Sequence, residues 1–276
     1  MNGQRLAIYD RPGAEPAVLF VHATGFHGRC WSQIMGRIPE RRSIAVDLRG
    51  HGLSSKPESD YTWSVFGNDV AALARELDLR GATAVGHSMG GHSITLAATL
   101  VPEAFSELIL VDPVILRPEA YHGRRWDPHF ARKRRDRWAS ADEMFNRFKD
   151  RQPFVQWDVD VLRDYCDYGL VPATDGDGYV LACSPAVEGS IYEASALDDA
   201  NLYDRLGTID IPVTIVRAHR PMDTHPAMDM GASPTAPDLV AHFRHGMDIQ
   251  TQLSHFIPME APAMLADLIR GHHIVT

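Results

Sequence analysis

A serine set between two glycines is the first feature of this sequence that could do chemistry. Residues 84–93 read AVGHSMGGHS, so Ser88 lies two positions after Gly86 and two before Gly90, where an apolar run ends. A serine on a sharp strand-to-helix turn needs small neighbours at these positions, because larger side chains would collide across the turn. The backbone N–H of Met89 would then point toward a developing oxyanion. The pattern predicts a nucleophilic serine.

A serine hydroxyl is a weak nucleophile until a base takes its proton, and a late histidine fits that role. His255 lies in TQLSHFIPMEAP, residues 251–262, after the last predicted strand and before a final helix-like segment. We therefore predict that His255 is the base. The other late histidines fall in a helix-like segment or in the tail, and we expect them at the surface: His242, His245, His272 and His273.

Short apolar runs that could position these residues recur along the chain. They are apolar throughout rather than alternating, which is typical of strands buried on both faces of a parallel sheet. Between them, residues 65–79 and 91–100 have helix-like patterns. Strand–helix alternation predicts an open α/β sheet, whose chemistry gathers at the carboxyl ends of the strands, where Ser88 lies. The predicted strands are residues 17–22, 43–48, 82–87, 107–112 and 212–218.

One long interval interrupts this alternation. About a hundred residues separate the runs 107–112 and 212–218, whereas a crossover needs only a few tens. The surplus is rich in aromatic residues and carries a basic run, ARKRRDRW at 131–138, which we interpret as a solvated helix face. We expect a mainly helical insertion over one edge of the sheet. Residues 171–185 look like a loop or a short extended piece within it.

Composition excludes some classes of protein. The net charge of −9 argues against a nucleic-acid partner, since phosphates select basic surfaces. No apolar stretch approaches the ~20 residues of a membrane span, and the start of the chain shows no secretory signal. Cys30, Cys166 and Cys183 form no CxxC pair. These features predict a reduced cytoplasmic protein without a disulfide framework or zinc site, as a monomer or homodimer.

Three motifs together resemble the α/β-hydrolase family. They are VHATGFHGRCW at 21–31, DLRGHGLS at 47–54 and GHSMGG at 86–91, and the likeness runs nearly end to end. The resemblance implies an α/β-hydrolase core from residues 1–117 and 206–276, with residues 118–205 as a cap over the active site. It also implies the order serine, acid, histidine, and chemistry without a metal or organic cofactor.

The resemblance also suggests the second oxyanion donor. In the family, the loop after an early strand usually reads His-Gly-X, and X donates an N–H beside the one after the serine. Here the corresponding residues are His22, Ala23 and Thr24, with alanine in place of the usual glycine. Thr24 is therefore the predicted donor, together with Met89.

Two aspartates compete for the acid of the triad. Many relatives place it after the strand corresponding to residues 212–218, in a pattern close to G-x-x-D. Here Ala218 replaces the glycine, Pro221 holds the aspartate position, and Asp223 lies two residues late. Other relatives place the acid after the preceding strand, where Asp112 stands, although Asp-Pro can also merely end a strand. We prefer Asp112 to Asp223.

The remaining polar residues of the motifs are interpreted as structural. His87 and His92 are taken as packing or helix-surface residues, and His22 as a support of the oxyanion loop. Asp47 and His51 are expected to fix a loop near the sheet edge.

The leading functional hypothesis is hydrolysis of a carboxylic ester or lactone, a small-molecule substrate, through an acyl-enzyme. Ser88 attacks, His255 shuttles protons and Asp112 orients it. The same residues would suit a C–C bond, an amide, or perhydrolysis by a cofactor-free haloperoxidase. Arg124, Arg125 and the aromatic residues of the cap would suit an acidic or aromatic substrate, although most of these aromatics are expected to form the cap's own core. A ligand-sensing protein that keeps the triad is the alternative from another class.

Overall fold

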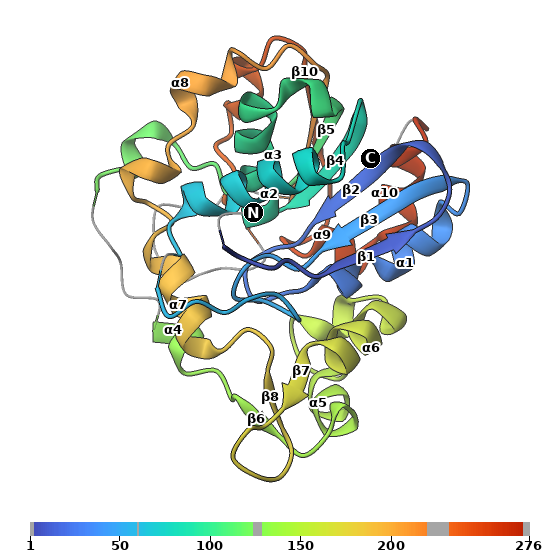
Figure 1. Ribbon diagram of the computed structural model, residues 1–276, viewed down its shortest axis with the longest axis vertical. Helices are drawn as coiled ribbons and strands as arrows, with labels where there is room; N and C mark the ends of the chain where they lie inside the picture. The colour runs from blue at the N-terminus through green and yellow to red at the C-terminus, as the bar shows by residue number, and fades with distance from the viewer. Residues whose placement is uncertain (1–2, 60, 124–128, 220–231, 273–276) are drawn as a thin grey trace.

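The computed structural model describes residues 3–59, 61–123, 129–219 and 232–272. Its centre is a seven-stranded sheet of order β1-β3-β2-β4-β5-β9-β10, in which only β1 runs antiparallel to its neighbour (Figure 1). All five predicted strands are present, and the α/β-hydrolase architecture is confirmed. The strands are β1 (Ile8–Arg11), β2 (Ala14–Val21), β3 (Arg41–Val46), β4 (Ala82–His87), β5 (Phe105–Val111), β9 (Val213–Arg217) and β10 (Gly246–Gln250).

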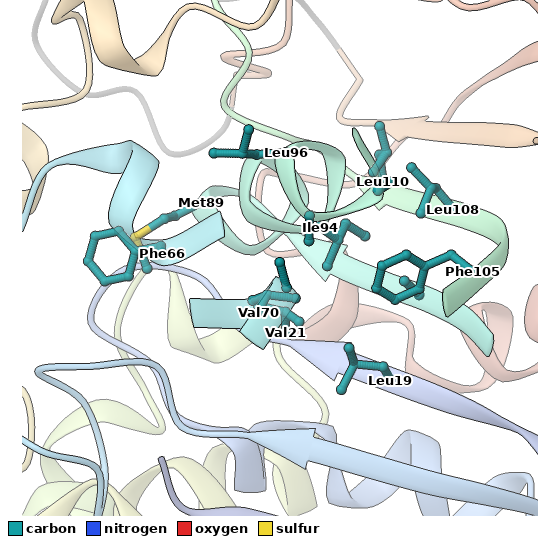
Figure 2. Packing of buried hydrophobic residues seen from close by; sticks show 14 of the residues in the cluster. Leu19, Val21, Phe66, Val70, Met89, Ile94, Leu96, Phe105, Leu108 and Leu110 are labelled. Carbon is teal, nitrogen blue, oxygen red and sulfur yellow. The ribbon is translucent and has the colours of Figure 1, made fainter. Parts of the chain in front are cut away.

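Helices cover both faces of this sheet, which explains why its central strands are apolar throughout. On one face pack α2 (Trp63–Glu76) and α3 (Met89–Leu100), and on the other α1 (Ser32–Arg37) and α10 (Pro262–Ile269). Successive side chains of β2 alternate between the two layers. Leu19 and Val21 join the α2–α3 layer, shown in Figure 2, whereas Val18 and Phe20 join the α1–α10 layer.

Part of the chain between β5 and β9 forms a lobe beside the sheet, seen at the bottom of Figure 1, whereas its last part packs into the core. Helices are the main regular elements of the lobe, and the three longest begin at serine or aspartate caps, Ser140, Asp158 and Ser184, whose side chains accept backbone N–H groups. The lobe also contains a three-stranded antiparallel sheet of order β6-β8-β7. Its elements are α4 (His129–Arg132), β6 (Arg137–Trp138), α5 (Ala141–Phe148), α6 (Val159–Tyr168), β7 (Leu170–Pro172), β8 (Tyr179–Leu181) and α7 (Pro185–Glu193). The short helix α8 (Tyr203–Leu206) leads back to the core.

Two expectations about this lobe need correction. A sheet was not predicted, although β8 and most of β7 fall within residues 171–185, where a loop or a short extended piece was expected. The basic run 131–138 is not a solvated helix face, since helix α4 ends at Arg132. Four of its arginines instead form ion pairs with acidic residues of the same lobe: Arg132 with Glu193, Arg134 with Glu188, Arg135 with Glu143 and Arg137 with Asp175. The boundaries 118 and 205 stay a prediction.

In the part of the chain that the structure describes, no helix is long and apolar enough to span a membrane.

Candidate active site

The glycines around Ser88 allow a tight turn between β4 and α3. Ser88 has φ +56° and ψ −117°, a conformation that is unfavourable for a residue with a side chain. A Cβ on Gly90 would lie 2.1 Å from the carbonyl oxygen of Val21, and one on Gly86 would lie 2.4 Å from that of Gly90. Only glycine fits at either position, so the turn has the shape that the glycine spacing predicts.

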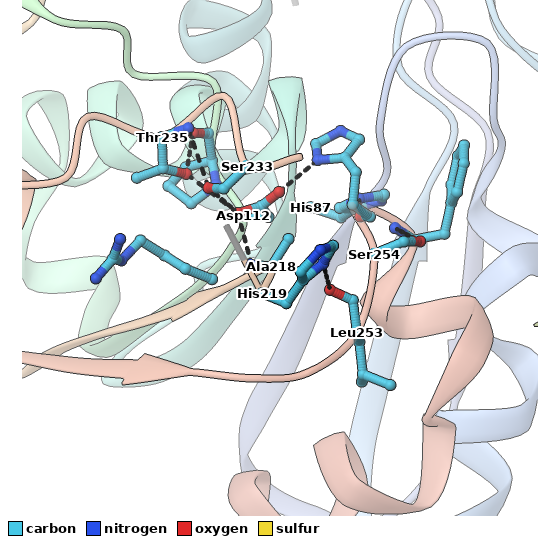
Figure 3. A network of polar contacts seen from close by, with 12 residues as sticks. His87, Asp112, Ala218, His219, Ser233, Thr235, Leu253 and Ser254 are labelled. Carbon is cyan, nitrogen blue, oxygen red and sulfur yellow. Dashed lines mark hydrogen bonds and ion pairs between the residues drawn. The ribbon is translucent and has the colours of Figure 1, made fainter. Parts of the chain in front are cut away.

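Asp112 and His255 meet at the carboxyl edge of the sheet. Asp112 follows β5, is fully buried, and accepts a hydrogen bond from His255 Nδ1 at 2.6 Å through Oδ2. Its other oxygen accepts the N–H of Ala218 at 3.1 Å and the hydroxyls of Ser233 and Thr235 (Figure 3). These contacts fix the orientation of the carboxylate, with Oδ2 left facing the imidazole. The arrangement can therefore orient a histidine and stabilise its imidazolium.

Asp223, the other candidate acid, lies outside the described residues, as do Arg124, Arg125 and His273. The remaining late histidines stand apart from the Asp112–His255 pair. His242 ends a 3-10 turn, His245 approaches Asp210 at the surface, and His272 is exposed near the chain's end.

His87 connects the turn of Ser88 to the loop of His255. Its Nε2 donates to the carbonyl oxygen of His255 at 2.8 Å, and the two rings are 5.0 Å apart. Burial lowers the pKa of His87 well below its usual value, so the ring is neutral. The interpretation of His87 as a packing residue therefore missed a specific contact. The same holds for His92, which is buried and donates to the carbonyl of Ala200 at 2.9 Å.

Ser88 directly follows His87 in the chain and is buried, with 6% of its surface exposed. Among the described residues, no hydrogen bond joins its hydroxyl to His255. Such contacts are often long in a free enzyme and tighten only when substrate binds.

Thr24 and Met89 approach each other next to Ser88. The hydroxyl of Thr24 donates to the sulfur of Met89 at 3.4 Å, and both residues are buried. Within the described ranges, neither backbone N–H has an acceptor. Met89 begins α3, and the first N–H groups of a helix have no partner within it. Two N–H donors are thus available for one negatively charged oxygen.

Two neutral histidines hold the loop that carries Thr24. His22 donates from Nδ1 to the carbonyl of Ala23 at 2.7 Å and accepts the N–H of Leu48 at 2.9 Å through Nε2. Burial lowers its pKa to about 3. His51 accepts the N–H of Gly25 at 3.0 Å. His22 thus has the contacts of the loop support that we predicted.

Asp47 ties together the loops around this site. It accepts the N–H of Gly28 at 2.7 Å, the N–H of Leu53 at 2.8 Å and the hydroxyl of Tyr9 at 2.9 Å. All its partners are structural, which agrees with the expectation that Asp47 fixes a loop.

Aromatic residues of the lobe pack over the site. The ring of Phe26, two residues after Thr24, lies 5.3 Å from Tyr165 and 5.8 Å from Trp157, both from the lobe. Trp157 in turn lies 5.2 Å from Phe256, the neighbour of His255. The lobe therefore contacts both the oxyanion loop and the histidine loop.

No metal site accompanies these residues. Over the described ranges, no group of three or more histidine, cysteine, aspartate or glutamate side chains is placed to hold a metal ion.

The comparisons with known proteins agree with this fold. A model of the alpha/beta hydrolase family matches residues 18–268, and the chain belongs to that family. Esterase Rv0045c of Mycobacterium tuberculosis is 24% identical over 94% of this chain and 83% of its own. The crystal structure of E-2-(acetamidomethylene)succinate hydrolase superposes with a TM-score of 0.73 at 22% identity, covering 96% of this chain and 94% of the other.

Other relatives match at higher identity over shorter segments. The 2-(acetamidomethylene)succinate hydrolase of Mesorhizobium japonicum is 37% identical over 101 residues, 36% of either chain. Three uncharacterized mycobacterial proteins are 37% identical over 112 residues, 40% of this chain. The chain thus spans about a third of the length of these relatives, 33% for the mycobacterial proteins.

Proposed function

We propose that this protein is a serine hydrolase that cleaves a carboxylic ester or a lactone through an acyl-enzyme. The observation that carries the proposal is the 2.6 Å hydrogen bond from His255 to buried Asp112, on a loop that His87 ties to the turn of Ser88. The esterase that matches most of this chain supports it. Residues 118–205 serve as the cap that covers the reacting bond.

Each residue has one role in the first half of the reaction. Nε2 of His255 takes the proton of Ser88 as the hydroxyl oxygen attacks the carbonyl carbon. The carbonyl oxygen becomes negative and accepts the N–H groups of Thr24 and Met89. Asp112 stays ionised and stabilises the imidazolium. Collapse of this intermediate breaks the ester C–O bond, and the imidazolium gives its proton to the departing alkoxide.

Water completes the cycle. His255 takes a proton from a water molecule as the water oxygen attacks the acyl carbon, and the same two N–H groups hold the oxyanion. Collapse releases the carboxylic acid, and the proton returns to the oxygen of Ser88. A lactone follows the same path, except that acid and alcohol leave as one molecule.

An amide is the second candidate bond. The observation in its favour is the 37% identity, over 101 residues, to a hydrolase whose named substrate carries an acetamido group. The triad would act in the same way, with an amine leaving instead of an alcohol.

The test is hydrolysis of 4-nitrophenyl esters from acetate to decanoate, together with a lactone series, by the wild type and by Ser88→Ala. The matched control is Ser93→Ala, a buried serine of α3 whose hydroxyl donates to the carbonyl of Met89 at 2.8 Å. We expect sustained turnover in the wild type and the control, and its loss in Ser88→Ala. Turnover that survives in Ser88→Ala would exclude the proposal. Inertness on all esters and lactones, with cleavage of N-acyl compounds, would favour the amide.

A further inference from the structure

We propose that Arg134 binds a carboxylate on the acyl part of the substrate, so that the enzyme prefers esters that carry a negative charge. This assignment rests on the proposed ester hydrolysis at Ser88. Arg124 and Arg125, which the sequence suggested for acidic substrates, lie outside the described residues. Arg134 belongs to the same lobe, and its contacts are described.

Arg134 reaches the oxyanion loop. A Cβ on Gly25, the residue after Thr24, would lie 3.1 Å from Nη1 of Arg134 and 2.8 Å from Oε1 of Glu188. Gly25 has φ +80°, which favours glycine and keeps this space open for the ion pair. The guanidinium therefore lies against the loop that is proposed to hold the substrate's carbonyl oxygen.

Within the described residues, the guanidinium of Arg134 donates only some of its possible hydrogen bonds to the protein. Nη1 donates to Glu188, and Nη2 donates to the hydroxyl of Tyr165 at 2.8 Å. A guanidinium carries five N–H groups, so about three remain without an acceptor among the described residues. The hydroxyl proton of Tyr165 likewise has no acceptor there. Arg134 and Tyr165 thus offer donors of the kind that carboxylates bind best.

Exposure distinguishes the two members of the ion pair. The side chain of Arg134 is 26% exposed, whereas that of Glu188 is 6% exposed. An approaching anion therefore meets the cation and not the carboxylate behind it.

The position of Arg134 indicates the acyl side. The leaving alcohol takes its proton from His255, on the loop that also carries Phe256. Arg134 instead adjoins the oxyanion loop. Half-esters of short dicarboxylic acids, such as glutarate, have a charge on the acyl chain and are the substrate class that this arrangement fits.

The test compares two esters with the same leaving group, 4-nitrophenyl butyrate and mono-4-nitrophenyl glutarate. Arg134→Gln should lower kcat/KM for the charged ester about tenfold to hundredfold, and that for the neutral ester by less than about threefold. Arg137→Gln is the matched control, because it removes one positive charge from an exposed ion pair of the same segment. An equal fall on both esters, or no change in their ratio, would overturn the inference.

Glu188 provides a second comparison. Arg134→Gln leaves a buried carboxylate without its partner and can impair folding. The double variant Arg134→Gln with Glu188→Gln avoids this problem and should still lose the preference for the charged ester. Glu188→Gln alone should keep or increase the preference, because it frees the guanidinium. If Arg134 and Glu188 serve only to hold the structure together, the ratio of kcat/KM for the charged ester to that for the neutral ester should be the same in all three variants.

Binding is measured separately from catalysis. In a Ser88→Ala background, glutarate should raise the unfolding temperature more than sodium chloride does at equal ionic strength, and Arg134→Gln should remove the difference. An equal rise in both variants, or none in either, would overturn the inference. If the wild type hydrolyses neither ester while glutarate still binds through Arg134, the proposed ester hydrolysis fails and the anion site stands.

Discussion

His87 donates a hydrogen bond from Nε2 to the carbonyl oxygen of His255 at 2.8 Å, although 168 positions separate the two residues in the chain. The contact links the residue before the proposed nucleophile to the backbone of the proposed base. It needs a proton on Nε2, and burial, which lowers the pKa of His87, keeps the ring from taking up a second proton. The strand end and the histidine loop are thereby held as one unit.

Replacing His87 should therefore lower kcat as well as the free energy of unfolding, because the contact positions the proposed base. His87→Phe removes the donor and leaves the carbonyl of His255 unsatisfied, which should destabilise the fold by about 1–3 kcal/mol. We also expect kcat to fall at least about tenfold, because a small displacement of a catalytic group is costly. His92→Phe is the control, since His92 is equally buried and donates to a carbonyl far along the chain, that of Ala200. Equal kcat values in the two variants would remove the positioning role from His87.

Replacing the acid tests the choice between the two aspartates. Asp112→Asn should keep the shape of the site but lose the charge that stabilises the imidazolium, and kcat should fall by up to about 10⁴. Asp223→Asn should retain near wild-type turnover. Steady-state kinetics of both variants on one ester decide the matter. The opposite pattern, with loss only in Asp223→Asn, would transfer the role to Asp223.

Acid should destabilise the protein through its buried histidines. Burial lowers the pKa of His22 to about 3 and that of His92 to about 4. Unfolded histidine titrates near pH 6.5, so below that pH the unfolded chain binds protons that the folded chain does not. Stability from each such group is complete above about pH 6.5 and is lost as the pH falls, by about 1.4 kcal/mol per unit. The others with lowered pKa are His27, His51 and His87.

Urea unfolding between pH 7.5 and 5.0 measures this loss. The free energy of unfolding should fall below pH 6.5, and His92→Phe should reduce the slope by about 1.4 kcal/mol per pH unit, since one proton fewer is taken up. A wild-type stability that stays constant over this range would contradict the prediction, because it would mean that the folded and unfolded chains take up equal numbers of protons.

The central strands could be predicted from sequence because both faces of each are buried, which forces a continuous apolar run. The two missed strands, β1 and β10, lie at the edges of the sheet. Four of the five residues of β10 are exposed, so the strand has no continuous apolar run. The short strands of the lobe could not be identified one by one for a different reason. Two or three residues are too few to show the alternation of a strand.

At the site, what could be predicted depended on how local each signal is. The glycines around Ser88 belong to the turn whose shape they permit, so the sequence motif alone was enough to predict the shape of the turn. The partner of His87 is a backbone carbonyl, which leaves no mark on the sequence. Arg134 belongs to a basic run that we interpreted as a solvated helix face. Only the tertiary fold brings Glu188 and Tyr165 into contact with it. Asp112 and Asp223 could not be separated without knowing where His255 lies.

Gly90 gives the sharpest test of the turn itself. A Cβ at this position would lie 2.1 Å from the carbonyl oxygen of Val21, and the atom it meets is backbone of a buried central strand, which cannot move aside. Gly90→Ala should therefore destabilise the fold by at least about 3 kcal/mol, or prevent folding. Gly207→Ala is the control, because its Cβ would meet nothing within 4 Å. Urea unfolding of both variants measures the difference. If Gly90→Ala unfolds at the wild-type midpoint, β2 and α3 are packed less closely than the structure shows, and the strained turn of Ser88 loses its physical basis.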